Sequence, residues 1–113
     1  MRVLFDNGTP RGVAAALTDH VVVEARTHGW DTLRNGELLD AAERAGYHVF
    51  VTTDRNIQHQ QNLTGRRIAI VVLGVGRWRL IKNKLVDIAA AVAAATPGSF
   101  EEVEIPNDLT ERR

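Results

Sequence analysis

The chain has 113 residues, which is enough for one domain with a hydrophobic core of its own. Hydrophobic residues make up 44% of it and charged residues 25%, as in an ordinary globular domain. The formal net charge of +0 gives no sign of a polyelectrolyte, and the lack of cysteine excludes disulfides, zinc–thiolate sites and thiol nucleophiles.

The domain organisation expected from the sequence is simple. Residues 1–106 are predicted to form a single domain and residues 107–113 a flexible C-terminal tail. No N-terminal signal is visible before the first apolar run, and no apolar run is long enough to span a bilayer. We therefore expect a cytoplasmic protein without membrane contact.

The first apolar run, residues 3–5, has the continuous hydrophobicity of a strand that is buried on both faces. It leads directly into Asp6. Thr9 is a suitable N-cap and Pro10 a suitable first helical residue, so a helix is predicted from there to about residue 17. A second short strand is predicted at 21–23.

A polar loop at 25–35 follows the second strand. Asn35 is the predicted N-cap of a helix at 36–45, which Gly46 is expected to end. The next apolar run, 49–51, is the third predicted strand. The pattern of strand, helix and strand is thus repeated within the first half of the chain.

The second half continues this alternation. A short irregular helix is predicted at 57–63, and the most hydrophobic strand of the sequence at 68–73. A long helix at 80–95 carries one continuous apolar stripe, and a final edge strand is expected around 100–105. This order predicts an α/β protein with a mainly parallel sheet of four to five strands and helices on both faces.

Three acids are expected at one end of this sheet. Asp6 follows the first strand, Glu37 opens the helix after the second, and Asp54 comes just after the third. The strands of a parallel sheet all point the same way, so their carboxyl ends lie together at one edge. We therefore expect these three carboxylates to meet at the carboxyl end of the sheet, although they are far apart in sequence.

Carboxylates gathered in one place repel one another unless a cation neutralises them. Oxygen ligands suit Mg²⁺ or Mn²⁺ rather than zinc, and Mg²⁺ usually takes one or two carboxylates together with water and substrate phosphate. Asn7 and Asn56 add neutral oxygens, and Asp40 lies one helical turn from Glu37. Each acid also has a purely structural interpretation, as a first-turn helix residue, a turn former or a solvated surface charge.

Two stretches resemble the PIN domain family. At 36–56 an acid opens an alanine-rich helix, and a glycine, a hydrophobic strand and a threonine-containing turn with an acid follow. At 4–7 a hydrophobic strand ends in aspartate, as in the first motif of these domains. The resemblance covers most of residues 1–85, and the whole chain looks like the small, toxin-like PIN relatives.

This resemblance implies a three-layer α/β/α PIN-like fold and a Mg²⁺- or Mn²⁺-dependent ribonuclease, in many relatives the toxin of a toxin–antitoxin pair. RNA would be the substrate and an antitoxin protein a partner. Asp6, Glu37 and Asp54 match the metal-binding, catalytic acids by position, and Asn56 a lesser polar partner. Full PIN domains carry another acid on helices near the middle, for which Asp31 or Glu24 is a poor substitute here.

The segment 66–86 contains basic residues and no acid. Within it Arg77, Trp78 and Arg79 follow the fourth strand, and Arg11 opens the first helix, so all four are expected near the carboxyl end of the sheet. In a nucleic-acid-binding interpretation the arginines hold phosphates and the tryptophan stacks on a base. In the structural alternative, Trp78 packs under a loop.

Two other functions stay open at this level. One is a non-catalytic PIN-like module that acts by binding protein or RNA, because the further acid of full PIN domains is missing. The other is a response-regulator receiver, which needs paired acids after the first strand and a lysine after the last, whereas this chain has Asp6-Asn7 and no such lysine. The apolar last helix and the acidic final strand are compatible with a homodimer.

Overall fold

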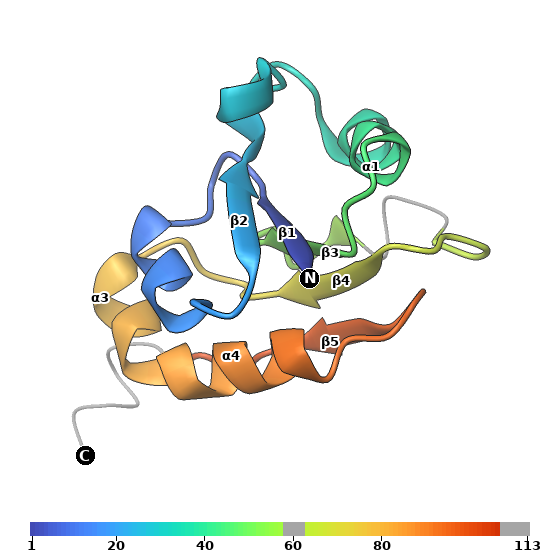
Figure 1. Cartoon of the computed structure of the whole chain (residues 1–113). Helices are drawn as coiled ribbons and strands as arrows, with labels where there is room; N and C mark the ends of the chain where they lie inside the picture. The colour runs from blue at the N-terminus through green and yellow to red at the C-terminus, as the bar shows by residue number, and fades with distance from the viewer. Residues whose placement is uncertain (58–62, 107–113) are drawn as a thin grey trace.

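The computed structural model describes residues 1–57 and 63–106 (Figure 1). The predicted helix at 57–63 lies almost entirely outside these residues, and the predicted tail at 107–113 lies wholly outside them. Within the described part, helical segments separate most of the successive strands, which confirms the α/β class expected from the sequence.

One five-stranded, all-parallel sheet forms the centre of the molecule. Its strands are β1 (Arg2–Phe5), β2 (Val21–Glu24), β3 (Val49–Thr52), β4 (Ala69–Val72) and β5 (Phe100–Glu102). Their spatial order is β2-β1-β3-β4-β5, so β2 and β5 form the two edges (Figure 1). The first four predicted strands are confirmed to within one residue at each end, and the fifth is shorter than predicted.

The direction in which strands are added reverses at β1. The chain first crosses from β1 to β2 on one side and then returns to β3 on the other side. In doubly wound sheets, ligands bind in the crevice at the carboxyl ends of two such strands, because the connecting loops leave in opposite directions. The fold therefore places the expected ligand-binding crevice at the carboxyl ends of β1 and β3.

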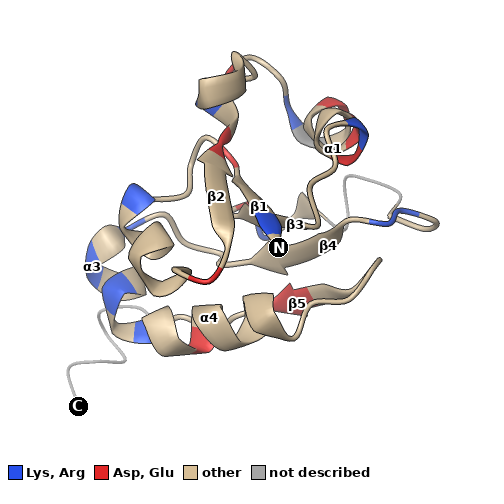
Figure 2. Ribbon diagram, in the orientation of Figure 1, with Lys and Arg blue, Asp and Glu red and all other residues tan. Residues whose placement is uncertain are grey.

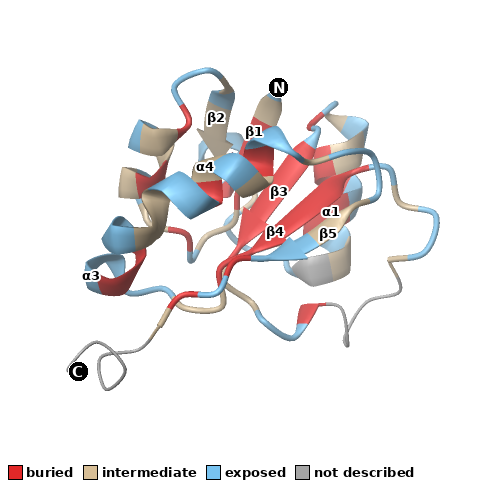
Figure 3. Cartoon of the chain, turned by 90° about the horizontal axis from the view of Figure 1, so that it is seen from below, coloured by how far each residue is buried: buried red, intermediate tan, exposed pale blue. Residues whose placement is uncertain are grey.

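The two faces of the sheet carry separate hydrophobic cores, as the alternation of side chains along a strand requires. Val3 and Phe5 belong to one core and Leu4 to the other. All residues of β3 and β4 are buried (Figure 3). The continuous apolar runs of the sequence are thus strands that are covered on both faces, as predicted.

Helices cover both faces of the sheet and give three layers (Figure 1). Helix α1 (Asn35–Arg44) packs on one core through Leu38, Leu39 and Ala42, and the 3₁₀ segment η2 (Ala25–His28) adds Ala25 to the same core. The other face is covered by η1 (Arg11–Ala16), α3 (Trp78–Ile81), η3 (Lys82–Lys84) and α4 (Leu85–Ala93).

The first helical segment differs from the prediction. Residues 11–16 form a 3₁₀ helix rather than an α-helix, and its N-cap is Pro10, without a side-chain hydrogen bond. Thr9 is instead buried, and its hydroxyl lies 2.6 Å from Asp6 Oδ1 and 3.1 Å from the main-chain oxygen of Val51. A hydroxyl that was expected to cap a helix therefore joins the ends of β1 and β3.

Two further helix boundaries were wrong in detail. Helix α1 begins at Asn35 with Arg34 as its N-cap, so Asn35 is not the cap, whereas Gly46 follows the helix with a φ of 85° as predicted. The single long helix predicted at 80–95 is divided into α3, η3 and α4, because Lys84 leaves the helical region at φ −121° and ψ 20°.

Even so, the apolar stripe of the divided helix is used as expected. Ile81, Ile88 and Val92 are buried against the sheet, and Leu85 and Ala95 pack beside them. The longest helices of the described part are α1, with 10 residues, and α4, with 9. No helix in residues 1–57 and 63–106 has the length and apolar character needed to cross a membrane.

Candidate functional site at the carboxyl end of the sheet

Asp6 leaves β1 at the point where the loops after β1 and β3 diverge. Its main-chain N–H donates to Val51 O at 3.0 Å, which continues the contact with β3. On its carboxylate, Oδ1 accepts hydrogen bonds from Gly8 N–H at 3.1 Å and the Thr9 hydroxyl at 2.6 Å. Oδ2 accepts one from the Thr52 hydroxyl at 2.5 Å. The half-buried carboxylate is therefore fixed from both strands.

Thr52, the last residue of β3, links Asp6 to Asp54. Its side chain is buried, and the oxygen that donates to Asp6 also accepts the main-chain N–H of Asp54 at 3.0 Å. Asp54 Oδ1 accepts the N–H of Asn56 at 2.9 Å, so Asp54 does have the turn-forming role that was the structural alternative. Asp54 Oδ2 takes part in no hydrogen bond within the described residues.

These side chains line a cavity of about 420 Å³. Three carboxylates, those of Asp6, Asp31 and Asp54, and the guanidinium-bearing Arg34 contribute to its wall. Its apolar part includes Phe50, from the centre of β3. The volume lies in the range of small-molecule sites, and charged groups from three separate loops converge on it.

Asn7 ties the loop before α1 to this end of the sheet. Its Nδ2 donates to the main-chain oxygen of Asp31 at 3.4 Å, and its own main-chain oxygen accepts from Arg26 at 3.2 Å. Its Oδ1 is buried without a hydrogen-bond partner in the described part of the chain. A buried acceptor without a donor costs about 1–3 kcal/mol.

In the part of the chain that the structure describes, the carboxylates of this cavity form no ion pair. All the hydrogen-bond donors to Asp6 are neutral. Among residues 1–57 and 63–106, no ion pair involves Asp6, Asp31 or Asp54. In the same residues, no three Asp, Glu or His side chains lie close enough together to hold a metal ion. The site therefore holds carboxylates outside any ion pair of the described residues, with Arg34 as a cation in the same wall, but not a ready-made three-carboxylate cluster.

The other predicted site residues lie further away. Glu37 is exposed in the first turn of α1 and is not among the residues that line the cavity. Asp40 pairs with Arg66 at 2.9 Å, toward the amino ends of the strands. Asn56 is exposed and contributes only its main-chain N–H, to Asp54. Two of the three predicted acids, Asp6 and Asp54, are thus brought together, and Glu37 is not.

The predicted nucleic-acid-binding residues belong to a basic surface, which we define as the exposed residues Arg11, Arg77, Trp78, Arg79 and Lys82 on and beside η1, α3 and η3, whose ribbons carry basic residues in Figure 2. Arg77, Trp78 and Arg79 are exposed at the start of α3. The Trp78 ring covers Gly12 so closely that a Cβ there would lie 2.4 Å from it, yet 41% of the residue remains exposed. Arg11 pairs with the last residue of β2 at 3.1 Å. Trp78 therefore packs on η1 and still keeps an exposed surface.

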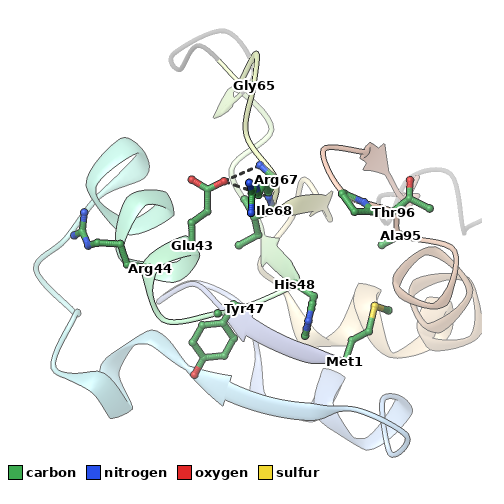
Figure 4. Close-up of a pocket in the computed structure, with 12 residues that line it drawn as sticks. Met1, Glu43, Arg44, Tyr47, His48, Gly65, Arg67, Ile68, Ala95 and Thr96 are labelled. Carbon is green, nitrogen blue, oxygen red and sulfur yellow. Dashed lines mark hydrogen bonds between the residues drawn. The ribbon is translucent and has the colours of Figure 1, made fainter.

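A larger cavity, of about 680 Å³, lies at the amino end of the sheet (Figure 4). The carboxylate in its wall, Glu43, already accepts hydrogen bonds from Arg66 at 2.7 Å and from the main-chain N–H groups of Arg67 at 2.8 Å and Ile68 at 3.3 Å. Arg44 points away from the cavity in Figure 4. Polar groups do not converge here, so size alone does not make this cavity the better candidate.

Comparisons with protein-family models, with curated proteins and with solved structures give no match to this chain. Function is therefore inferred from the residues of the site and their geometry.

Sequence reasoning missed Arg34 and gave too little weight to Asp31. Both belong to a loop without hydrophobic periodicity, so no pattern fixed its course. Only the topology could have predicted their place, because a loop that connects a parallel strand to the following helix lies at the carboxyl end of the sheet. The buried hydroxyls of Thr9 and Thr52 were also missed, since a threonine next to a strand end looks like an ordinary cap or turn residue.

Proposed function

We propose that the chain is a PIN-like, divalent-metal-dependent ribonuclease whose site lies at the carboxyl ends of β1 and β3. The observation that carries this proposal is the carboxylate of Asp6, which three neutral donors hold beside Asp54 without a cation. A fixed carboxylate of this kind attracts a positive ion. Because the polar wall offers carboxylate and amide oxygens and no imidazole or thiolate, Mg²⁺ or Mn²⁺ fits it better than zinc.

In this proposal Asp6 and Asp54 would hold the ion, with water and a substrate phosphate as the remaining ligands. Thr9 and Thr52 orient Asp6, since donors behind a metal-binding carboxylate fix its direction. When bound, the ion would activate water and neutralise charge on the phosphate. Glu37 remains the predicted third acid, and Asp31, which lines the cavity, competes with it for this role.

RNA is the proposed substrate because the cavity adjoins the basic surface. A Cβ built on Gly76 would lie 3.6 Å from Gly8 O, so the loop that leads to Arg77 touches the loop after β1. Arg77 and the exposed part of Trp78 would bind a phosphate and a base outside the cavity. The resemblance to the toxin-like PIN relatives adds an antitoxin protein to the same proposal as the partner.

Calorimetric titration with Mn²⁺ tests the metal site without any choice of substrate. The wild-type chain is expected to bind Mn²⁺, and Asp54→Ala is expected to lose this binding while it stays folded. Asp19→Ala removes an exposed acid outside the cavity and is the matched control, with binding unchanged. Absence of Mn²⁺ binding to the wild type at millimolar concentration would overturn the metal proposal.

Cleavage of a labelled pool of single-stranded RNA tests the activity. Cleavage is expected with Mn²⁺ or Mg²⁺, to be lost with EDTA and to be lost in Asp6→Asn. Comparing Asp31→Asn with Glu37→Gln identifies the third acid, since only the acid that takes part should reduce cleavage strongly. RNA cleavage that survives in Asp6→Asn would contradict the assignment of the site.

A non-catalytic RNA-binding module is the second candidate. It is favoured by the lack of a three-carboxylate cluster in the described residues and by the hydrogen bonds that both oxygens of Asp6 already accept. This candidate predicts RNA binding that needs Arg77 and Trp78, is indifferent to EDTA and is unchanged in Asp6→Asn. Filter binding with these variants separates it from the ribonuclease.

A further inference from the structure

Among residues 1–57 and 63–106, nothing pairs with one side of the β5 main chain. Ser99 O accepts the N–H of Ile70 at 2.9 Å, and Val103 N–H donates to Val72 O at 2.9 Å. Main-chain groups alternate between the two sides of a strand, so the odd-numbered residues of this strand face β4. The N–H and C=O groups of Phe100 and Glu102 therefore point away from the sheet. Since β5 is the last strand in the spatial order, this edge can accept a further strand.

A groove of about 450 Å³ runs between this edge and α4. Its α4 side is made of small side chains, those of Ala90, Ala91 and Ala94, and its β5 side includes Val103. Figure 3 shows that β5 and the outer surface of α4 are largely exposed. A strand added beside β5 would place alternate side chains over the alanines, where room is available for long side chains.

The groove is acidic. Asp87, Glu101, Glu102 and Glu104 line it, and Lys84 is the one cation among the described residues of its lining. Lys84 pairs with Asp87 at 3.6 Å, and Arg55 pairs with Glu102 at 3.4 Å. Within the described part of the chain Glu101 and Glu104 are exposed and belong to no ion pair. Two carboxylates beside the unpaired main chain thus remain without compensation.

This charge decides which strand fits the edge. Antiparallel pairing of two β5 strands would bring the glutamates of one copy against those of another, and like charges in opposed positions are destabilising. A strand that carries lysine or arginine would instead form favourable cross-strand pairs. We propose that the β5 edge and the α4 groove bind an extended cationic segment of a partner protein, which adds to the sheet as an outer strand. This inference is independent of the proposed ribonuclease.

The test uses the full chain and two labelled hexapeptides, one alternating Lys and Val and the other alternating Glu and Val. Binding is followed by fluorescence anisotropy at low and at physiological salt. The lysine peptide is expected to bind and the glutamate peptide is not. Circular dichroism confirms that each variant below is folded before its binding is compared.

Two variants probe the main chain of the edge. Glu102→Pro removes the outward N–H while leaving the bonds of Val103 and Ser99 to β4 in place, and proline is tolerated on an edge strand. Glu102→Ala is the matched control, which loses the same side chain but keeps the N–H. Binding of the lysine peptide is expected to weaken about tenfold more in the proline variant than in the alanine variant.

A charge reversal probes the acidic groove. The double variant Glu101→Lys and Glu104→Lys is expected to exchange the preference, so that it binds the glutamate peptide and not the lysine peptide. Asp19→Lys changes an exposed acid that lies just before β2, the opposite edge strand, and should leave the preference as in the wild type.

Three results would overturn the proposal. One is the absence of lysine-peptide binding to the wild type at millimolar concentration. Another is equal binding by Glu102→Pro and Glu102→Ala, which would mean attraction by charge alone without strand addition. The third is a wild-type dimer in sedimentation that Glu102→Pro dissociates, which would assign the edge to a second copy of this chain.

Discussion

Each end of the sheet holds one carboxylate that accepts three hydrogen bonds, and the two differ in their partners. At the amino end, Glu43 accepts one bond from the guanidinium of Arg66 and two from main-chain N–H groups. At the carboxyl end, Asp6 accepts one bond from a main-chain N–H and two from the hydroxyls of Thr9 and Thr52. Glu43 is thus neutralised by a cation and Asp6 is not.

This difference shows which carboxylate is structural. The Glu43–Arg66 pair joins α1 to the segment before β4, and both side chains are largely buried, with 26% and 17% of their surfaces exposed. Asp6 is also held by three hydrogen bonds, but it forms no ion pair within residues 1–57 and 63–106. A carboxylate that is rigid and uncompensated is suited to bind a cation, whereas one that is rigid and compensated only stabilises the fold.

The largest effect on stability is expected from Glu43→Ala. This change leaves two main-chain N–H groups without their acceptor. It also removes one of the two carboxylate partners of Arg66, while the other, Asp40, remains. A loss of about 2–3 kcal/mol in the free energy of unfolding is expected, measured by urea denaturation. Glu43→Gln, which keeps one acceptor oxygen, should lose less. A loss below about 0.5 kcal/mol in Glu43→Ala would show that the amino-end carboxylate is not structural.

A smaller loss is expected from Thr52→Val. The hydroxyl of Thr52 donates to Asp6 and accepts from Asp54 N–H, and valine has the same shape without the hydroxyl. The free energy of unfolding should fall by about 1–2 kcal/mol in metal-free buffer. Thr52→Ser keeps the hydroxyl and should recover most of this loss. A valine variant as stable as the wild type would show that these hydrogen bonds do not contribute to stability.

Asp6→Asn should change the stability of the metal-free chain by less than about 1 kcal/mol. The amide has the shape of the carboxylate and removes an uncompensated charge, while the hydroxyl of Thr52 can reverse and accept a hydrogen bond from it. In Mn²⁺ at ten times the dissociation constant, the wild type should gain about 1.4 kcal/mol and Asp6→Asn nothing. Equal shifts of their melting temperatures with Mn²⁺ would show that the ion binds elsewhere.

The smallest effect is expected from Arg11→Ala. Arg11 and Glu24 form the ion pair nearest to Asp6 along the chain, but the Arg11 side chain is 77% exposed. Exposed pairs contribute little, so the free energy of unfolding should change by less than about 0.5 kcal/mol and not at all in high salt. The comparison predicts that the exposed Arg11–Glu24 pair contributes less to stability than the buried Arg66–Glu43 pair. A larger change in Arg11→Ala would contradict this prediction.

The strands were the predictable part of the fold, because a strand that is covered on both faces needs an uninterrupted apolar run. The apolar runs at 3–5, 49–51 and 68–73 are too short for buried helices and are therefore best explained as buried strands. The meeting of Asp6 and Asp54 was predictable for the same reason, since both follow such runs in a parallel sheet. Nothing local revealed the order of the strands.

Glu37 shows where this reasoning was insufficient. The position of a residue at the start of a helix determines at which end of the sheet the residue lies. It does not determine the direction in which the side chain points. Successive residues of a helix are rotated by about 100°, so Glu37 and Leu38 face different ways. Leu38 is buried and lines the cavity, whereas Glu37 is exposed. A difference of one residue in the helix boundary is enough to change which side chain enters the site.

The hydrogen bond from Thr52 to Asp6 joins residues 46 positions apart in the chain. Closing a long loop costs chain entropy, so we expect this contact to form late in folding. A ligand that bridges Asp6 and Asp54 would therefore meet its site only in the nearly native chain. Such a ligand should slow unfolding in proportion to its affinity and leave the rate of refolding almost unchanged.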